Sequence, residues 1–418
     1  MLYKQINNLT KTNAVFSSIR HSFLLLVLIA LCQSCTNRKE IETIESSTTD
    51  VAYQISLNKS GKIILDEILE NIKYIPLKKY DGKILGAVDK LISSNGEIII
   101  LDKTHSKCVF VFDSLGNNKL IIDSFGNAPG EYSTMLDVSV DEARNEILIL
   151  DDSRTEIYRY SKLNGEYIGK YNEMGRFYVD EFIYFENNFF FNTGNACETF
   201  CNSLIKYDLQ SKTTSGYLDI PEDQQNKNYS GLNLLTKAPD GVLLSQTFNN
   251  TVYKYDGKDI YPYISFDAGA YNITDRSIFT RFKSNLVRFT QEINKYFQGP
   301  RLILETSDMI YMESNMDYAK NWMFYNKGQS STHSANSLSL SSNLKNLSFR
   351  APKGILFDQL TGVLDSDELQ AIKKSLEANN ISRDLLDEDF MEILSGITDE
   401  SNPLLMLYRF KWSHDEQK

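Results

Sequence analysis

The chain has 418 residues, 42% of them hydrophobic and 24% charged, with a formal net charge of −11. This length and composition suffice to bury one large hydrophobic core or two smaller ones. The acidic balance argues against nucleic acid as a partner, because such a surface repels phosphate backbones and the sequence offers no basic stripe.

The N-terminus has the pattern of a secretion signal. Three basic residues and no acidic residue precede the apolar run FLLLVLIAL at 23–31. Nine apolar residues are too few to span a bilayer, but they are typical of a signal-peptide core. Two cysteines follow, and signal peptidases need small side chains before the cut. Ser34 precedes Cys35 whereas bulky Leu31 precedes Cys32, so we expect cleavage of residues 1–34 before Cys35.

The segment around Cys35 resembles a bacterial lipobox, which implies a lipid attached to the Cys35 thiol. Cys32 stands where a leucine is usual, and an ordinary secretory signal cut nearby is the alternative. Residues 35–50 are polar and rich in Ser and Thr, so we expect a flexible tether. A lipid anchor would place the protein in the cell envelope as an outer-membrane lipoprotein, facing the periplasm or the cell surface.

From residue 51 onward, short apolar runs alternate with loops of Asn, Asp, Gly and Ser, which predicts successive antiparallel hairpins. The stretches GEIIILDKTHSKCVFVFDSLGN and NEILILDDSRTEIYRYSKLNGE align with Asp102 over Asp151. A repeat in the forties to fifties with about four strands per unit is typical of a β-propeller blade. The blades of a propeller close into a ring and bury one another's faces.

The stretch FGNAPGEY at 125–132 falls between the last strand of one predicted blade and the first strand of the next. Pro129 presets φ for a turn, and Gly130 supplies the positive φ that a type II turn requires. Glu131 and Tyr132 would then fix the crossing by hydrogen bonding and packing. A simple surface turn is the alternative.

Later strands are less regular, and we expect further blades from 186–212, 240–258 and 301–328. Strands at 53–57, 72–80 and 402–411 would complete a terminal blade from both ends of the chain. Two helical insertions are expected near 274–297 and 365–396. In the first, Ile278, Phe282, Leu286, Phe289 and Ile293 share the apolar face of an amphipathic helix, and in the second Leu369, Ile372 and Leu376 do so.

On these residues the chain resembles the bacterial six-bladed β-propeller lipoproteins, relatives of the NHL-repeat propellers. Gly126, Pro129, Gly130, Glu131 and Tyr132 match the family's G-x-G-P-G-E-Y linker, with Ala128 in place of a glycine. Segments 64–102 and 401–411 look like the family's entry segment and closing strand. The resemblance covers about 51–414 and implies an all-β fold of six four-stranded blades with short helical insertions.

The sequence contains no recognisable catalytic machinery. His105, His333 and His414 are isolated and are expected at the surface, and His21 belongs to the signal. No nucleophile elbow, zinc-protease, P-loop or dinucleotide motif occurs in a suitable setting, so we expect no cofactor and assign no catalytic residue. Cys197 and Cys201 predict a small-loop disulfide, with free thiols as the alternative. Cys108 is expected to be a buried small hydrophobe.

Acidic and aromatic residues have two interpretations each. Asp102, Asp151 and Asp152 follow their strands and would either ring a channel mouth and hold Ca²⁺ or cap local turns, and turn caps are favoured. We therefore predict no metal site. The run Phe189–Phe191 would either stack on sugars or fill wedges between blades, and wedge filling is favoured.

We therefore expect a monomeric, lipid-anchored envelope propeller that acts as a binding or scaffold protein for a protein, peptide or glycan. The alternative is a lyase- or hydrolase-type enzyme with polar residues gathered at the channel mouth; on balance the sequence favours a non-enzyme. A third hypothesis is an assembly partner of an envelope complex, which would expose an apolar patch on a helical insertion.

Overall fold

The computed structural model describes residues 51–57, 61–79, 83–152, 155–227, 234–282, 285–339, 349–383 and 386–412. All of them lie in one compact unit, Glu42–Lys418. The predicted signal, Cys35, the tether, His21 and His414 lie outside the described residues. Within the described residues, no helix has the length and apolar character needed to cross a membrane.

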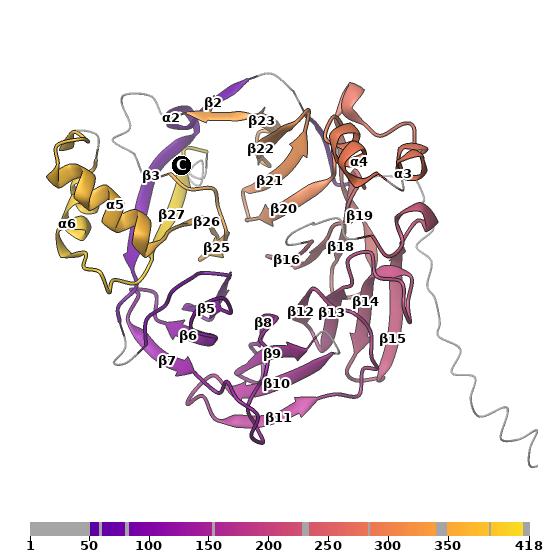
Figure 1. The fold of residues 1–418 in the computed structure, drawn as a ribbon, viewed down its shortest axis with the longest axis horizontal. Coiled ribbons are helices and arrows are strands. Elements are labelled where there is room, and N and C mark those ends of the chain that lie inside the picture. The colour runs from indigo at the N-terminus through magenta and orange to yellow at the C-terminus, as the bar shows by residue number, and fades with distance from the viewer. Residues whose placement is uncertain are drawn as a thin grey trace, which may run out of the picture. The chain divides into compact units, whose positions relative to one another are not determined.

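Six antiparallel sheets surround a central axis as the blades of a propeller, which confirms the predicted fold (Figure 1). The first strands of consecutive blades contact one another all the way round, so the ring is closed. The strands of blades 1 to 3, from axis to rim, are β4 (Lys90–Ser94), β5 (Glu97–Asp102), β6 (Cys108–Phe112), β7 (Asn118–Ile122); β8 (Asp137–Asp141), β9 (Glu146–Asp152), β10 (Glu156–Ser161), β11 (Tyr167–Tyr171); and β12 (Glu181–Phe185), β13 (Asn188–Asn192), β14 (Asn202–Asp208), β15 (Thr213–Asp219).

Blades 4 to 6 have the same four strand positions. The N-terminal strand β1 is added to blade 4, and β3 supplies the fourth strand of blade 6. Their strands are β16 (Leu235–Ala238), β17 (Gly241–Leu244), β18 (Thr251–Tyr255), β19 (Ile260–Asp267), β1 (Tyr53–Ser56); β20 (Pro300–Glu305), β21 (Met309–Met316), β22 (Ala319–Asn326), β23 (Ser331–Ala335); and β25 (Gly354–Leu356), β26 (Gln359–Leu364), β27 (Leu404–Phe410), β3 (Leu69–Pro76). A separate parallel pair joins β2 (Lys62–Ile64) to β24 (Ser337–Ser339).

The hydrophobic core is divided into wedges between blades. Ile98 and Ile100 of β5 belong to the cluster shared with blade 6, whereas Ile99 and Leu101 belong to the cluster shared with blade 2. Side chains alternate across a strand, and both faces of a blade are covered, so a middle strand must be apolar at every position. Phe189–Phe191 follow the same rule and fill the wedges on either side of blade 3.

Both ends of the described chain close the ring. β3 is the outermost strand of blade 6 and pairs antiparallel with β27, as expected for 72–80 and 402–411. The expectation for 53–57 was wrong, because β1 pairs parallel with β19 and adds a fifth strand to blade 4. The strand β19 is long and lies near the rim. Without β1, its outer edge would leave backbone hydrogen-bonding groups exposed, so β1 covers that edge.

Helices occur mainly as two insertions, α3 (Ile278–Arg281) with α4 (Leu286–Ile293), and α5 (Ser366–Glu377) with α6 (Glu388–Gly396). Short turns of helix also form at α2 (Leu65–Ile68), η1 (Glu222–Gln224) and η2 (Gly269–Tyr271). A capping box between Asp365 and Glu368 starts α5, and the three residues predicted on its apolar face are buried.

The first insertion differs from the single amphipathic helix predicted over 274–297. Asn285 begins a new helix, because its side chain accepts a hydrogen bond from the backbone N–H of Arg288. Ile278, Phe289 and Ile293 are buried as predicted, and Phe282 is half-buried. Leu286 lies on the same side of α4 as Phe289 and Ile293 but stands in the first turn of the new helix, where it is exposed.

Candidate functional site

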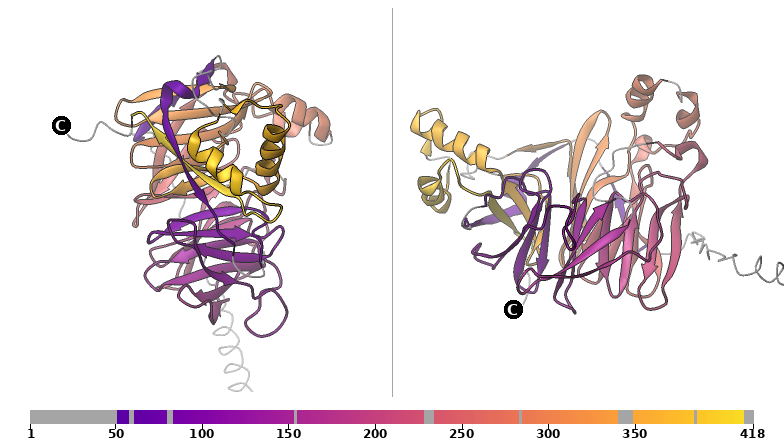
Figure 2. Two further views of the ribbon diagram at one scale, coloured as in Figure 1. Left: turned by 90° about the vertical axis from the view of Figure 1, so that its left-hand side faces the viewer. Right: turned by 60° about the horizontal axis from the view of Figure 1, so that its bottom comes forward.

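The two sides of the ring differ in construction. The insertion face is defined here as the side that carries the blade-to-blade linkers and the connections between second and third strands. The turn face is the opposite side, which carries the turns between first and second strands and between third and fourth strands. The insertions α3–α4 and α5–α6 both project from the insertion face (Figure 2). The loops on this face surround one end of the propeller axis.

The linker 125–132 lies between β7 and β8 and forms a turn on the insertion face. Gly130 has φ +87°, and the N–H of Glu131 donates to the carbonyl oxygen of Ala128 over 2.9 Å. This is the geometry of a type II turn with Pro129 at its second position. The Glu131 carboxylate accepts from the N–H of Ala128, and a Cβ on Gly126 would lie 2.0 Å from that carboxylate. Gly126 therefore leaves room for the Glu131 side chain.

Tyr132 anchors the end of this linker and is fully buried. Its hydroxyl lies 2.9 and 3.1 Å from the carbonyl oxygens of Lys107 and Ile122, which share its single proton, and it accepts from the N–H of Ser124. Burial raises the pKa of the Tyr132 phenol far above its usual range. These contacts tie the linker to the outer strands of blade 1, so the motif has a structural role.

Asp102 and Asp151 occupy equivalent places in blades 1 and 2. The Asp102 carboxylate accepts from the backbone N–H groups of Gly86 and His105 over 2.8 Å each. The Asp151 carboxylate accepts from the N–H of Thr134 over 2.5 Å. Each aspartate thus binds the linker that enters its own blade. The favoured interpretation as backbone caps describes both, whereas the Asp152 side chain lies outside the described part of the structure.

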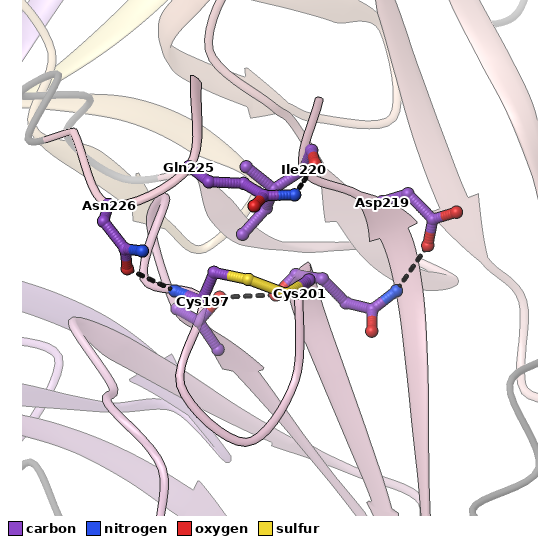
Figure 3. The surroundings of a disulfide bond; sticks show 8 residues. Cys197, Cys201, Asp219, Ile220, Gln225 and Asn226 are labelled. Carbon is purple, nitrogen blue, oxygen red and sulfur yellow. Dashed lines mark hydrogen bonds between the residues drawn. A yellow bond between two sulfur atoms is a disulfide. The ribbon is translucent and has the colours of Figure 1, made fainter. Parts of the chain in front are cut away.

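The structure joins Cys197 and Cys201 in a disulfide within the loop between β13 and β14 (Figure 3). The N–H of Cys197 donates to Asn226 Oδ1 over 2.9 Å, and the N–H of Ile220 donates to the Cys201 carbonyl oxygen over 2.9 Å. The bridged loop is therefore held against the linker that leaves blade 3, which makes it a rigid part of the insertion face.

A charged cluster, which we call the axial cluster, lies beside the propeller axis on the insertion face. Lys90, Asp137 and Glu181 are the first residues of β4, β8 and β12. The Lys90 ammonium contacts both carboxylate oxygens of Asp137 at 2.8 Å and the carbonyl oxygen of Phe182 at 3.2 Å. The N–H of Phe182 donates to Asp137 Oδ2 over 2.8 Å. Three consecutive blades are thus joined at the axis by one ion pair.

Glu181 is the member of this cluster with spare acceptor capacity. Its Oε1 accepts from Asn192 Nδ2 and from the N–H groups of Leu234 and Leu235, over 2.7 to 3.0 Å. Among the described residues, Oε2 has no hydrogen-bond donor. Burial, together with the nearby Asp137 carboxylate, raises the pKa of Glu181 to about 7. A carboxyl group with this pKa can exchange protons near neutral pH.

The axial cluster was not predicted from the sequence. A usable signal exists, because the three charged residues stand at one blade's spacing and each is the first residue of an innermost strand. That signal is visible only after the inner strands have been identified.

An apolar patch lies on the first helical insertion. The side chains of Leu286 and Val287 at the start of α4 are 76% and 68% exposed, and Tyr318 is 61% exposed. The N–H of Tyr318 donates to the carbonyl oxygen of Asn294, which places Tyr318 beside the end of α4. We call Leu286 and Val287, at one end of α4, and Tyr318, beside its other end, the α4 patch. Exposed apolar side chains on an inserted helix are candidates for an interaction surface.

The remaining candidates lie apart from these features. His105 is exposed, whereas His333 is half-buried and stacks on Trp412 with ring centroids 5.4 Å apart. Cys108 is buried, and burial raises the pKa of its thiol to about 12. Among the described residues, no three His, Cys, Asp or Glu side chains gather in a way that could hold a metal.

Two solved structures share the architecture. A "Putative exported protein" from Bacteroides fragilis NCTC 9343 is 18% identical, with a TM-score of 0.71 over 86% of this chain and 99% of that chain. A member of the duf4221 family from Bacteroides vulgatus is 11% identical, with a TM-score of 0.50 over 82% of this chain and 97% of that one. At these identities the likeness concerns the fold alone. No curated protein matches the chain. A family model described as "Domain of unknown function (DUF4934)" matches residues 47–409.

Proposed function

This chain belongs to the DUF4934 family, and from that premise we propose that it is an exported, lipid-anchored propeller that binds a protein partner through its insertion face. Export is supported by the signal pattern of residues 1–34 and by the description of the Bacteroides fragilis relative. Anchoring is supported by the position of Cys35 directly after Ser34.

The α4 patch is the observation that carries the binding role. Leu286 and Val287 protrude from an insertion that the ring does not need for closure, and burying them against a partner would release about 25 cal/mol per Å² of apolar area. The adjacent Arg288 is exposed, and among the described residues no acidic group pairs with it. Apolar side chains beside an arginine are typical of energetically dominant interface residues.

Site-specific photo-crosslinking in intact cells tests this role. A photoreactive side chain at position 287 should give a discrete protein adduct, and Arg288→Glu should reduce its yield at least fivefold. The matched control is position 163, because Leu163 is 83% exposed but lies in the turn between β10 and β11 on the turn face. Equal adducts from both positions would refute a specific partner at the insertion face.

The lipid anchor is tested by fractionation of cells. Cys35→Ala should abolish metabolic labelling with fatty acid and release the protein from the membrane fraction. Cys32→Ala is the matched control, since it alters the neighbouring cysteine and should leave labelling unchanged. Loss of labelling in the Cys32 variant alone would place the anchor at the other cysteine.

A second candidate is an enzyme at the channel mouth, favoured by the raised pKa of Glu181 beside the Lys90–Asp137 ion pair. In this function Glu181 would act as the general acid or base. Wild-type protein and Glu181→Gln should be compared on model ester, glycoside and uronate-lyase substrates. Turnover that is lost in the Gln variant supports the enzyme, and turnover that persists excludes this role for Glu181.

A further inference from the structure

The two helical insertions on the insertion face carry opposite charges. Residues 268–299, which contain α3 and α4, include five basic and two acidic residues, a net charge of +3. Residues 365–403, which contain α5 and α6, include three basic and eleven acidic residues, a net charge of −8. We call them the basic insertion and the acidic insertion. The basic insertion thus differs in sign from the chain as a whole, whose formal net charge is −11.

Arg288 is the charged group through which the basic insertion can attract a partner. It is exposed and has no acidic partner among the described residues. It directly follows Leu286 and Val287 of the α4 patch. The other described basic residues of this insertion each pair with a carboxylate within 3.0 Å; they are Arg276, Arg281 and Lys295. The insertion therefore presents an unneutralised positive charge beside exposed apolar side chains.

The acidic insertion presents the complementary surface on α6. Its Glu388, Asp389 and Glu392 are exposed, and no basic group in the described part of the chain pairs with them. Glu388 and Glu392 are one helical turn apart, where like charges repel, so a cation bound between them would relieve that repulsion. Met391 and Ile393 flank these carboxylates and are half-buried. This surface thus offers carboxylates for an arginine and apolar side chains for the α4 patch.

The placement of the two insertions makes the insertion face complementary to itself. Both insertions project from this face, and they stand on either side of blade 5, with α3 and α4 towards blade 4 and α5 and α6 in blade 6 (Figure 1). When two copies meet face to face, a two-fold axis that lies in the plane of the ring and passes between the insertions exchanges their positions. The basic insertion of each copy then lies opposite the acidic insertion of the other, so one contact is made twice.

We propose that the insertion face binds a second copy of this chain in such a two-fold dimer. Arg288 of one copy lies against Glu388 and Glu392 of the other, and Leu286 and Val287 pack against the apolar side chains of the same helix. This inference rests on the binding role proposed for the α4 patch and names its partner. It replaces the monomer that was expected from the sequence.

Sedimentation equilibrium of the full-length mature protein in density-matched detergent tests the dimer. We expect the average mass to rise from one chain towards two as the protein concentration increases. The association should weaken several-fold when salt is raised from about 0.1 M to about 1 M, because the screening length falls from about 10 Å to about 3 Å. A mass of one chain at every concentration would overturn the proposal, as would association that strengthens with salt.

Two charge reversals test the pairing itself. Arg288→Glu and Glu392→Lys should each weaken association at least tenfold, because each sets like charges side by side in both contacts of the dimer. An equimolar mixture of the two variants should associate at least tenfold more strongly than either variant alone. In a mixed dimer, one contact joins the two reversed side chains and the other contact is unchanged.

The mixture also serves as the folding control, because recovered association requires both variants to be folded. Glu166→Lys is the matched control, since Glu166 is an exposed carboxylate in the turn between β10 and β11 on the turn face and should leave association unchanged. A mixture that stays monomeric would refute the pairing, because Arg288 and Glu392 are exposed and their reversal leaves the core intact.

Photo-crosslinking at position 287 separates this inference from the binding role on which it rests. An adduct with twice the mass of the chain supports the dimer. An adduct with a different protein, together with a monomer in sedimentation, would overturn the dimer and leave the binding role of the α4 patch standing. The absence of any adduct would count against both.

Discussion

Two linkers in this propeller perform the same mechanical task in different ways. Residues 123–136 lead from β7 to β8, and residues 268–299 lead from β19 to β20, so each carries the chain from the rim back to the axis. The first is a compact corner whose Tyr132 is fully buried. The second carries α3 and α4 and exposes Leu286 and Val287 to solvent. The shorter linker shows that the crossing itself does not require the helices of the longer one.

The largest expected difference between the linkers concerns their apolar anchors. Tyr132→Ala should lower the free energy of unfolding by about 3–5 kcal/mol, because it leaves a cavity and unpaired carbonyl groups. Leu286→Ala should change it by less than about 0.5 kcal/mol, since the side chain is exposed. Denaturant unfolding of the two variants measures both values. Similar losses of unfolding free energy in the two variants would mean that the second linker contributes as much to stability as the first.

Glycines at positive φ provide a second comparison of the same linkers. Gly130 has φ +87°, and a Cβ there would meet the Tyr167 ring at 2.9 Å, so Gly130→Ala should cost about 2–4 kcal/mol. Gly269 has φ +58°, but a Cβ there would meet no atom within 4 Å, so Gly269→Ala should cost only about 1–2 kcal/mol. Thermal unfolding compares them, and a larger loss at Gly269 would contradict the expected order.

A third linker, which enters β16, is held by a titrating group. Glu181 accepts from the N–H groups of Leu234 and Leu235, and its pKa is raised to about 7. The folded state therefore binds a proton more tightly than the unfolded state, so the free energy of unfolding should fall as pH rises from about 4.5 to 7. We expect a change of about 1–3 kcal/mol.

Glu181→Gln is the control for this pH dependence, since it keeps an acceptor oxygen and cannot titrate. Unfolding measured at pH 5 and pH 7.5 should show a smaller difference for the variant than for the wild type. An identical pH dependence in both proteins would assign the titration to another group.

The strands and blades were predictable because local signals and tertiary burial agree there. The residues at 98–101, IIIL, are all apolar because alternate side chains fill two different wedges. The equivalence of Asp102 and Asp151 reflects the same backbone cap in two blades. The linker position followed from Pro129 and Gly130, whose backbone preferences do not depend on distant contacts.

The rest depends on contacts that are distant in sequence. The parallel pairing of β1 with β19 joins Tyr53 to Ile264, and no local pattern identifies that edge. A new helix begins after the cap at Asn285, so Leu286 stands in its first turn and is exposed although it was predicted to be buried. The axial cluster combines side chains from three blades, so its existence could not be derived before the ring order was known.

The pairing of β3 with β27 has a consequence for how the protein folds during its synthesis. Leu69–Pro76 leaves the ribosome early, but its partner Leu404–Phe410 is made almost last. Strand β3 therefore lacks its antiparallel partner, and its backbone N–H and C=O groups stay without their native hydrogen bonds, until most of the chain has been synthesised. Chains truncated before residue 404 should consequently form incomplete rings that chaperones recognise and proteases degrade.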